Sequence, residues 1–276
     1  MRIYFVTILL TGLFLCGCSW KKANIQEGEF EVYAPAPFYG AGFSMDEKSE
    51  AKRISLQFRP YDKETLQLSG LKNDSADTGP YGYSLRNENA NIAYRLKRFP
   101  VTGAFDYFSK NKLSMWGMGL GLDPYPFIRA TAGINSRFIE AGITGYLNYS
   151  LLHYTVNGKW ISYTDTFAGA MDDYGALSCE DCHDMKFNGG IGAFLNIFPI
   201  RELALTYAPF AYKPWWDDEL GKFDISVEFP FIFSHYFGAS YLIAKHIQVS
   251  AGTTVYFGQN FSGHYWFFDS SVGFVF

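Results

Sequence analysis

The sequence has no hydrophobic stretch after residue 17 long enough to form a membrane-spanning helix. Charged side chains are also scarce, at 18% of the 276 residues, and lysine and arginine form no cluster. With 23 basic side chains against 27 acidic ones, the chain is mildly acidic, so we expect no nucleic acid among its partners. Without an apolar helix, any crossing of a membrane must be made by β-strands.

Cysteines are few, and two of the four stand at the end of an apolar N-terminal segment. Residues 3–15 follow the positive charge of Arg2 and are almost wholly apolar, a length typical of a signal peptide and too short for a membrane span. The sequence Leu15-Cys16-Gly17-Cys18 resembles the bacterial lipobox, in which a small residue precedes an acylated cysteine. This resemblance implies that residues 1–17 are a lipoprotein signal peptide, that Cys18 carries the acyl chains (palmitate), and that residues 18–27 are a tether. An ordinary secretory signal is the alternative.

Aromatic residues and glycine are abundant, with 27 Phe, 20 Tyr and 27 Gly. In the last segment the apolar residues share one parity, whereas Asp269, Ser271 and Gly273 share the other. Side chains alternate between the faces of a strand, so one face is apolar and the other small and polar. The apolar set is Trp266, Phe268, Val272, Phe274 and Phe276. A strand that ends on an aromatic residue in this pattern resembles the C-terminal signal of bacterial outer-membrane proteins.

The same alternation recurs along most of the chain, near residues 29–32, 53–59, 128–134, 139–148, 190–197, 202–207, 223–233 and 246–257. This recurrence predicts an all-β fold, an antiparallel transmembrane β-barrel of about 12 strands (10–14 allowed) over residues 28–276. Polar stretches predict long loops near residues 71–90, 153–186 and 213–222. We therefore expect a protein of the cell outer membrane, lipid-anchored at its N-terminus. The alternative is a lipid-tethered soluble β-domain that binds a ligand in its apolar interior.

Charged residues on the polar parity are predicted to face the barrel lumen, because a charge facing lipid is costly. Their signs are mixed, so they either pair into a network that fills the interior or line a water-filled channel. The set is Glu29, Glu31, Arg53, Arg59, Arg95, Asp106, Arg129, Glu140, Glu202, Asp224, Glu228 and Asp269.

The sharpest chemical motif is Cys179-Glu180-Asp181-Cys182-His183. In an exported protein the simplest interpretation is a small disulfide between Cys179 and Cys182. The same spacing spells the C-x-x-C-H of covalent haem c attachment, with His183 as the iron ligand. A metal site of Cys179, Cys182 and His183 is the third interpretation, with Asp181 or Asp184 as fourth ligand. We expect no cofactor, and haem c and a metal ion stay open as alternatives.

A second motif places Trp215 and Trp216 before Asp217 and Asp218. Two indole rings beside carboxylates form a candidate binding platform for a sugar or a cation, although such rings more often anchor a strand at the membrane interface. No Ser/His/Asp arrangement is visible, so we expect no enzyme. The sequence favours a structural, surface-interaction or porin-like passive-pore role. The expected partners are outer-membrane lipids, with a small solute or a surface glycan.

Overall fold

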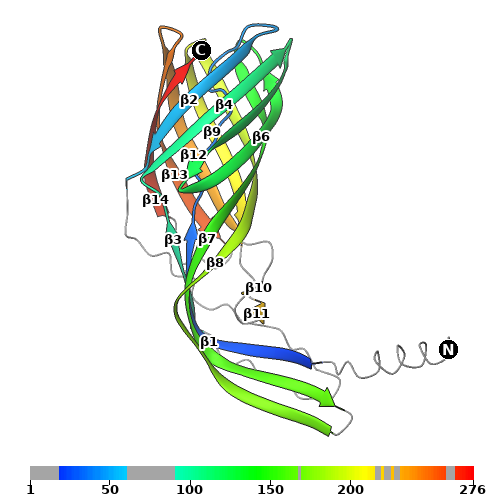
Figure 1. Ribbon diagram of the computed structural model, residues 1–276. Coiled ribbons are helices and arrows are strands. Elements are labelled where there is room, and N and C mark those ends of the chain that lie inside the picture. The colour runs from blue at the N-terminus through cyan, green and yellow to red at the C-terminus, as the bar shows by residue number, and fades with distance from the viewer. Residues whose placement is uncertain are drawn as a thin grey trace, which may run out of the picture.

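The computed structural model describes residues 19–60, 91–166, 169–214, 219–220, 225–226, 231–258 and 265–276. Among these residues, no helix is long and apolar enough to cross a membrane. Ten strands form a closed antiparallel barrel (Figure 1), so the predicted class is confirmed, with a strand number at the lower end of the predicted range. In ring order they are β7 (Ile139–Thr166), β6 (Tyr125–Asn135), β5 (Ser114–Asp123), β4 (Val101–Asn111), β2 (Glu50–Phe58), β14 (Tyr265–Val275), β13 (Ile247–Gly258), β12 (Ile232–Ile243), β9 (Leu203–Lys213) and β8 (Gly169–Ile200), which pairs back with β7.

Two further strands extend the sheet outside the ring. β1 (Ser19–Tyr33) pairs antiparallel with the part of β7 that lies beyond the barrel, and β3 (Asn91–Lys97) runs parallel to β1. Residues 19–27, expected to be a tether, therefore belong to a strand. A separate small ladder joins β10 (Glu219–Leu220) and β11 (Ile225–Ser226).

The lumen prediction is wrong for Glu29, Glu31 and Arg95. Arg95 pairs with Glu29 and Lys97 with Glu31 on the β1–β3 ladder, where these side chains are partly exposed. Alternation identifies a strand with two different faces, but it does not reveal which strand is its partner. The sequence pattern therefore could not separate β1 and β3 from the wall of the barrel.

The two ends of the barrel differ. The C-terminal mouth, where β14 ends, carries four short turns, at residues 112–113, 136–138, 201–202 and 244–246, whereas the turn at residue 124 between β5 and β6 lies at the other end. At the opposite end, called here the hairpin mouth, β7 and β8 continue as a long two-stranded hairpin (Figure 1). Residues 153–186, expected to be a loop, are strand throughout their described part. Leu152, Tyr154 and Val156 are buried and alternate with polar residues, an alternation that the loop prediction overlooked. Farther along the hairpin, backbone pairing between β7 and β8 forms the strands.

The barrel wall is apolar outside and polar inside. On β2, Ile54 and Leu56 expose 53% and 46% of their surface, whereas Arg53 and Ser55, which alternate with them, are buried. A soluble β-domain would show the reverse, with its apolar face in the core. The outward apolar residues include Met118, Leu120, Ile128, Ile143, Leu147, Ile191, Leu205, Phe237, Phe268 and Phe274. This wall matches a hydrocarbon environment and not water.

We predict that Met118→Arg, in the middle of β5, destabilises the barrel in lipid by about 2–4 kcal/mol, because it buries a charge near the bilayer midplane. Leu113→Arg is the matched control, since Leu113 is equally exposed but lies in a turn at the C-terminal mouth. The measurement is the urea midpoint of the compact, unboiled band on SDS gels. Equal midpoints for the two variants would contradict a lipid-facing wall.

Candidate functional site

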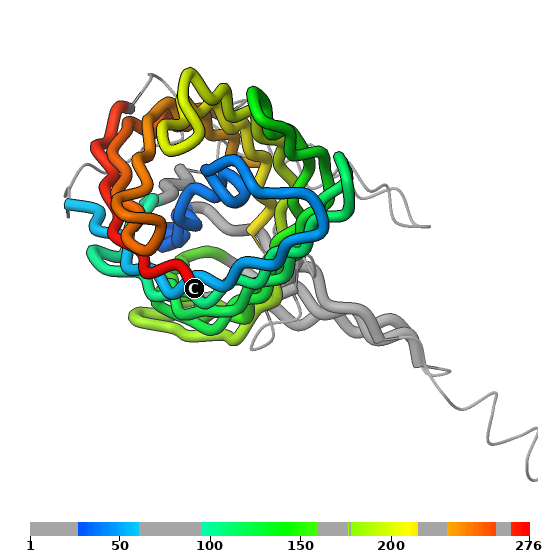
Figure 2. Tube along the Cα trace, turned by 90° about the horizontal axis from the view of Figure 1, so that it is seen from above, coloured from blue at the N-terminus to red at the C-terminus, as the bar shows by residue number. Residues whose placement is uncertain are grey.

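The lumen of the barrel is crossed by the protein's own chain. β1 ends at the hairpin mouth and β2 begins at the C-terminal mouth, so residues 34–49, called here the lumen segment, run between them inside the ring (Figure 2). Tyr39, Ala41, Phe43 and Met45 are at most 5% exposed. They pack with inward residues of the wall, Phe108, Met115, Phe194, Ala208 and Tyr236. An apolar core therefore fills part of the interior, where the sequence pattern predicts polar side chains.

The backbone of the lumen segment has no place in a sheet, and wall side chains satisfy it instead. Glu140 accepts hydrogen bonds from the backbone N–H groups of Ala41 (2.8 Å) and Gly42 (2.9 Å). Asn196 donates to the Tyr39 carbonyl oxygen at 2.7 Å. Buried backbone groups require hydrogen-bond partners. These polar wall residues supply them and so fix the path of the lumen segment.

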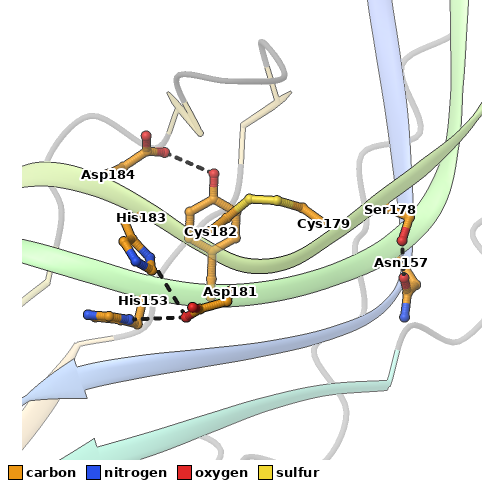
Figure 3. The surroundings of a disulfide bond; sticks show 9 residues. His153, Asn157, Ser178, Cys179, Asp181, Cys182, His183 and Asp184 are labelled. Atoms are coloured by element: carbon orange, nitrogen blue, oxygen red, sulfur yellow. Dashed lines mark hydrogen bonds and ion pairs between the residues drawn. A yellow bond between two sulfur atoms is a disulfide. The ribbon is translucent and has the colours of Figure 1, made fainter.

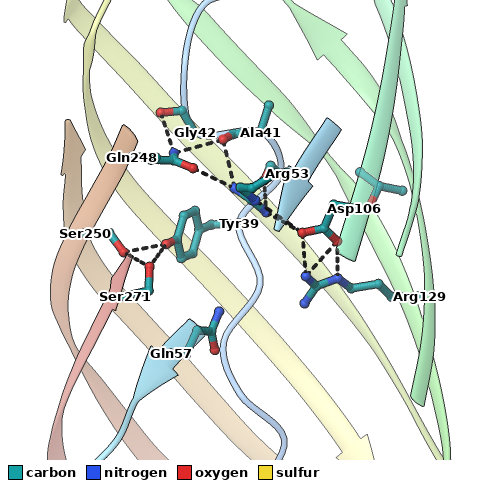
Figure 4. Close-up of polar contacts among 12 residues, drawn as sticks. Tyr39, Ala41, Gly42, Arg53, Gln57, Asp106, Arg129, Gln248, Ser250 and Ser271 are labelled. Atoms are coloured by element: carbon teal, nitrogen blue, oxygen red, sulfur yellow. Dashed lines mark hydrogen bonds and ion pairs between the residues drawn. The ribbon is translucent and has the colours of Figure 1, made fainter. Parts of the chain in front are cut away.

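Asn135, Gln248 and Ser240 continue the same pattern toward the C-terminal mouth. Asn135 accepts from the Met45 N–H at 2.9 Å and donates to the Phe43 carbonyl at 3.0 Å. Gln248 donates to the Ala41 carbonyl at 3.0 Å, and Ser240 donates to the Gly42 carbonyl at 2.8 Å (Figure 4 shows Gln248). The contacts come from strands around the ring, so the segment is held on several sides.

Gly40 is required twice over. Its φ of +74° lies in the left-handed region, and a Cβ there would stand 2.5 Å from a Glu140 carboxylate oxygen and 2.6 Å from the Phe194 ring. Only glycine allows this backbone to approach Glu140 so closely without strain.

Several buried charges inside the barrel form ion pairs with one another. Asp106 lies between Arg53, whose Nη2 is 2.9 Å from one carboxylate oxygen, and Arg129, whose Nε is 2.8 Å from the other (Figure 4). Arg53 also donates to the Ala41 and Gly40 carbonyls, so the ion-pair cluster holds the lumen segment directly. The Arg129 guanidinium lies 4.0 Å from the centre of the Phe38 ring, a cation–π contact.

Toward the hairpin mouth, Arg59 pairs with Asp123, and Arg98 pairs with Asp269. Arg59 donates to the Ala34 carbonyl at 2.9 Å, and Asp123 accepts from the Ala36 N–H at 2.6 Å. The structure thus places the predicted lumen residues Arg53, Arg59, Arg129 and Glu140 inside the barrel, where the three arginines form ion pairs and Glu140 binds backbone N–H groups and Asn196. Cys18, Trp215, Trp216, Asp217, Asp218, Asp224 and Glu228 lie outside the described residues.

The hairpin beyond the barrel carries the C-x-x-C-H motif. Cys179 and Cys182 form a disulfide, with their Cα atoms 6.0 Å apart, as the simplest interpretation predicts (Figure 3). With both sulfurs in this bond, neither is available to a haem vinyl group or to a metal as a thiolate. The haem interpretation, and the metal site built on Cys179, Cys182 and His183, therefore do not fit this structure.

The disulfide spans a bulge in β8. Tyr154 pairs with Cys182 and Val156 with Cys179, so one residue of β7 lies opposite Glu180 and Asp181. The bulge brings the Asp181 carboxylate to 3.7 Å from His153 Nδ1 and 3.9 Å from His183 Nδ1. Sequence reasoning identified His183 and missed His153, which stands thirty residues earlier in the chain. Only the hairpin register brings the two rings together.

The lumen segment was also missed. Its signal in the sequence is a set of aromatic rings, Phe38, Tyr39 and Phe43, among strand breakers such as Pro37 and Gly40. Apolar side chains on a backbone that cannot join a sheet need a cavity to fill.

No protein-family model and no curated protein matches this chain. Solved structures that match are bacterial outer-membrane β-barrels. They include the translocator domain of autotransporter NalP from Neisseria meningitidis (9% identity, TM-score 0.34, 85% of this chain and 90% of that one). An outer membrane channel from Pseudomonas putida F1 matches at 9% identity and a TM-score of 0.39 over 87% and 100% of the two chains. The KdgM porin in complex with disordered oligogalacturonate matches at 9% identity and 0.32 over 81% and 98%. The assignment to the membrane-barrel class rests on the geometry of the wall.

We predict that Gly40→Ala lowers the stability of the barrel by about 1–3 kcal/mol, through a strained backbone and a clash with Glu140. Gly145→Ala is the control, because a Cβ at Gly145 meets no atom within 4 Å. Urea unfolding followed by tryptophan fluorescence measures both variants. If Gly40→Ala unfolds at the wild-type midpoint, the lumen segment is not held in this conformation.

Proposed function

We propose that the protein is a non-enzymatic lipoprotein of the outer membrane whose closed, non-conducting barrel anchors a surface-interaction hairpin. The observation that carries the proposal is the lumen segment, whose backbone is bound by the wall from Asp123 near one mouth to Asn135 near the other. An ordered peptide inside a ten-stranded ring supports a closed barrel, because it occupies space that solutes would need to pass.

The orientation follows from the usual asymmetry of outer-membrane barrels, which have short turns in the periplasm and longer segments outside the cell. Four short turns lie at the C-terminal mouth and the long hairpin of β7 and β8 lies at the other, so the hairpin, with β1 beside it, projects from the outer surface. The fourteen residues of β7 from 153 to 166 would extend about 45 Å if straight. Such a projection suits contact with a surface partner, for which a glycan is the chemical class that we propose.

An acyl anchor on Cys18 would lie on the same side as the hairpin. Ser19, the next residue, begins β1, and β1 runs from beyond the hairpin mouth toward the barrel (Figure 1). An even number of membrane crossings would place both ends of the chain on the same side of the membrane. Ten wall strands are even, but the lumen segment adds one further crossing, so the two ends fall on opposite sides. The proposed lipid would then insert in the outer leaflet.

A passive pore is the second candidate function. It requires the lumen segment to move out of the barrel interior. The observation that favours it is that polar side chains of the wall hold the backbone of the segment by hydrogen bonds, which water can replace. The polar wall that remained would suit a small solute.

We predict that the mature protein gives no steady conductance in planar bilayers, because the lumen segment blocks the barrel. Deleting residues 19–45 leaves all ten wall strands and should produce stable channels. Heat-modifiability on SDS gels is the control that the deletion variant is still a folded barrel. Steady wild-type channels would overturn the closed barrel and support the passive pore.

We predict that radioactive palmitate labels the protein in cells and that Cys18→Ser abolishes the label, whereas Cys16→Ser keeps it. The reason is that only Cys18 follows a small residue, as the lipobox requires. Protease added to intact cells should cut within the hairpin. A Cys18→Ser variant that is still labelled would remove the lipid from the proposal, and a hairpin protected in intact cells but cut after lysis would reverse the orientation.

A further inference from the structure

Three side chains with metal-binding atoms converge on the hairpin just outside the barrel. His153 of β7 and His183 of β8 are paired directly across the hairpin, and their ring centres are 4.2 Å apart. Residues opposite one another in this way project from the same face of a sheet. The two imidazoles are therefore held side by side by the backbone register.

The disulfide-spanned bulge supplies the third group. Asp181 has a φ of +57°, which turns its side chain out of the regular strand direction and toward the two rings (Figure 3). Its Oδ1 lies 3.7 Å from His153 Nδ1 and 3.9 Å from His183 Nδ1, and the three candidate ligand atoms lie within 4.8 Å of one another. The Cys179–Cys182 bond closes the bulge on both sides of Asp181, so it constrains where this carboxylate can lie.

Two neighbouring carboxylates, Asp184 and Glu31, are engaged elsewhere. Asp184 accepts a hydrogen bond from the Tyr154 hydroxyl at 3.1 Å, and burial together with this carboxylate raises the pKa of the tyrosine. Glu31 lies opposite His153 on the other side of β7 and pairs with Lys97. Asp181 is thus the carboxylate that the geometry directs to the two histidines.

We propose that His153, Asp181 and His183 bind a divalent transition-metal ion of the zinc or copper type. Two imidazoles and one carboxylate are a ligand set that such ions accept, and three protein ligands leave a position for water or for a group from a partner. Ligand atoms around tetrahedral zinc, each about 2.0–2.1 Å from the ion, are separated by about 3.3 Å. The observed oxygen–nitrogen distances exceed this by about half an ångström. Because all three side chains are partly exposed, modest rotations close that gap, and an ion can reach the site from solvent.

The experiment is titration of the purified, folded protein with Zn²⁺ against a competing zinc indicator, with Mg²⁺ as the ion that this ligand set should reject. We expect one saturable zinc site per chain. His153→Ala and Asp181→Asn should each weaken it at least about tenfold, since even changes to residues that merely orient ligands cost 10–100-fold. Glu180→Gln is the matched control, because it removes the same charge from an exposed neighbour on the same bulge and should leave the affinity unchanged.

A Cys179→Ser/Cys182→Ser variant separates this site from one made by thiolates, and it should retain a saturable zinc site. The proposal is overturned if the wild type has no saturable site, or if Asp181→Asn and Glu180→Gln bind alike. It is also overturned if the double cysteine variant loses the site that Asp181→Asn keeps, because the sulfurs would then be the ligands. All of these residues lie outside the barrel wall, so an unchanged heat shift on SDS gels confirms that each variant is folded.

Discussion

A ring of ten strands encloses more space than its own inward side chains fill, and the rest of this structure depends on how that space is occupied. Eight strands give an interior that side chains just fill, and wider barrels hold a ligand, water or a plug. Here the occupant is the chain itself, with Tyr39 and Phe43 in an apolar core and the backbone between them bound by Glu140. The inward polar residues therefore form hydrogen bonds with the lumen segment and ion pairs with one another.

The buried charges around Asp106 are stable inside the barrel because they form ion pairs with one another. Asp106 is paired with two arginines, Arg53 and Arg129, and those arginines have further contacts with a carbonyl and an aromatic ring of the lumen segment. Removing one partner of such a cluster would leave an uncompensated charge, which costs far more than the cluster contributes when complete. The position of the lumen segment and the stability of the wall therefore depend on the same ion pairs.

The hairpin is not subject to the constraint that shapes the barrel wall, where one face must be apolar. Outside a bilayer its strands are stabilised by backbone pairing with each other and with β1, and either face can carry polar groups. This freedom permits the bulge, the Cys179–Cys182 disulfide and the His153–Asp181–His183 cluster in one short stretch. In the function that we propose, the barrel anchors the protein in the membrane and the hairpin carries the metal ligands.

The amino-acid sequence by itself determined the class of fold, because alternation such as that of Ile54 and Leu56 against Arg53 and Ser55 records which side of each strand meets lipid. It also determined the inward position of Arg129 and Glu140, since a charge is excluded from the lipid side. Only the tertiary structure decided that residues 34–49 cross the lumen, that β1 stands outside the ring, and that His153 meets His183. These features depend on which strands pair and in what register, and pairing between segments far apart in the chain leaves no periodic trace in either one.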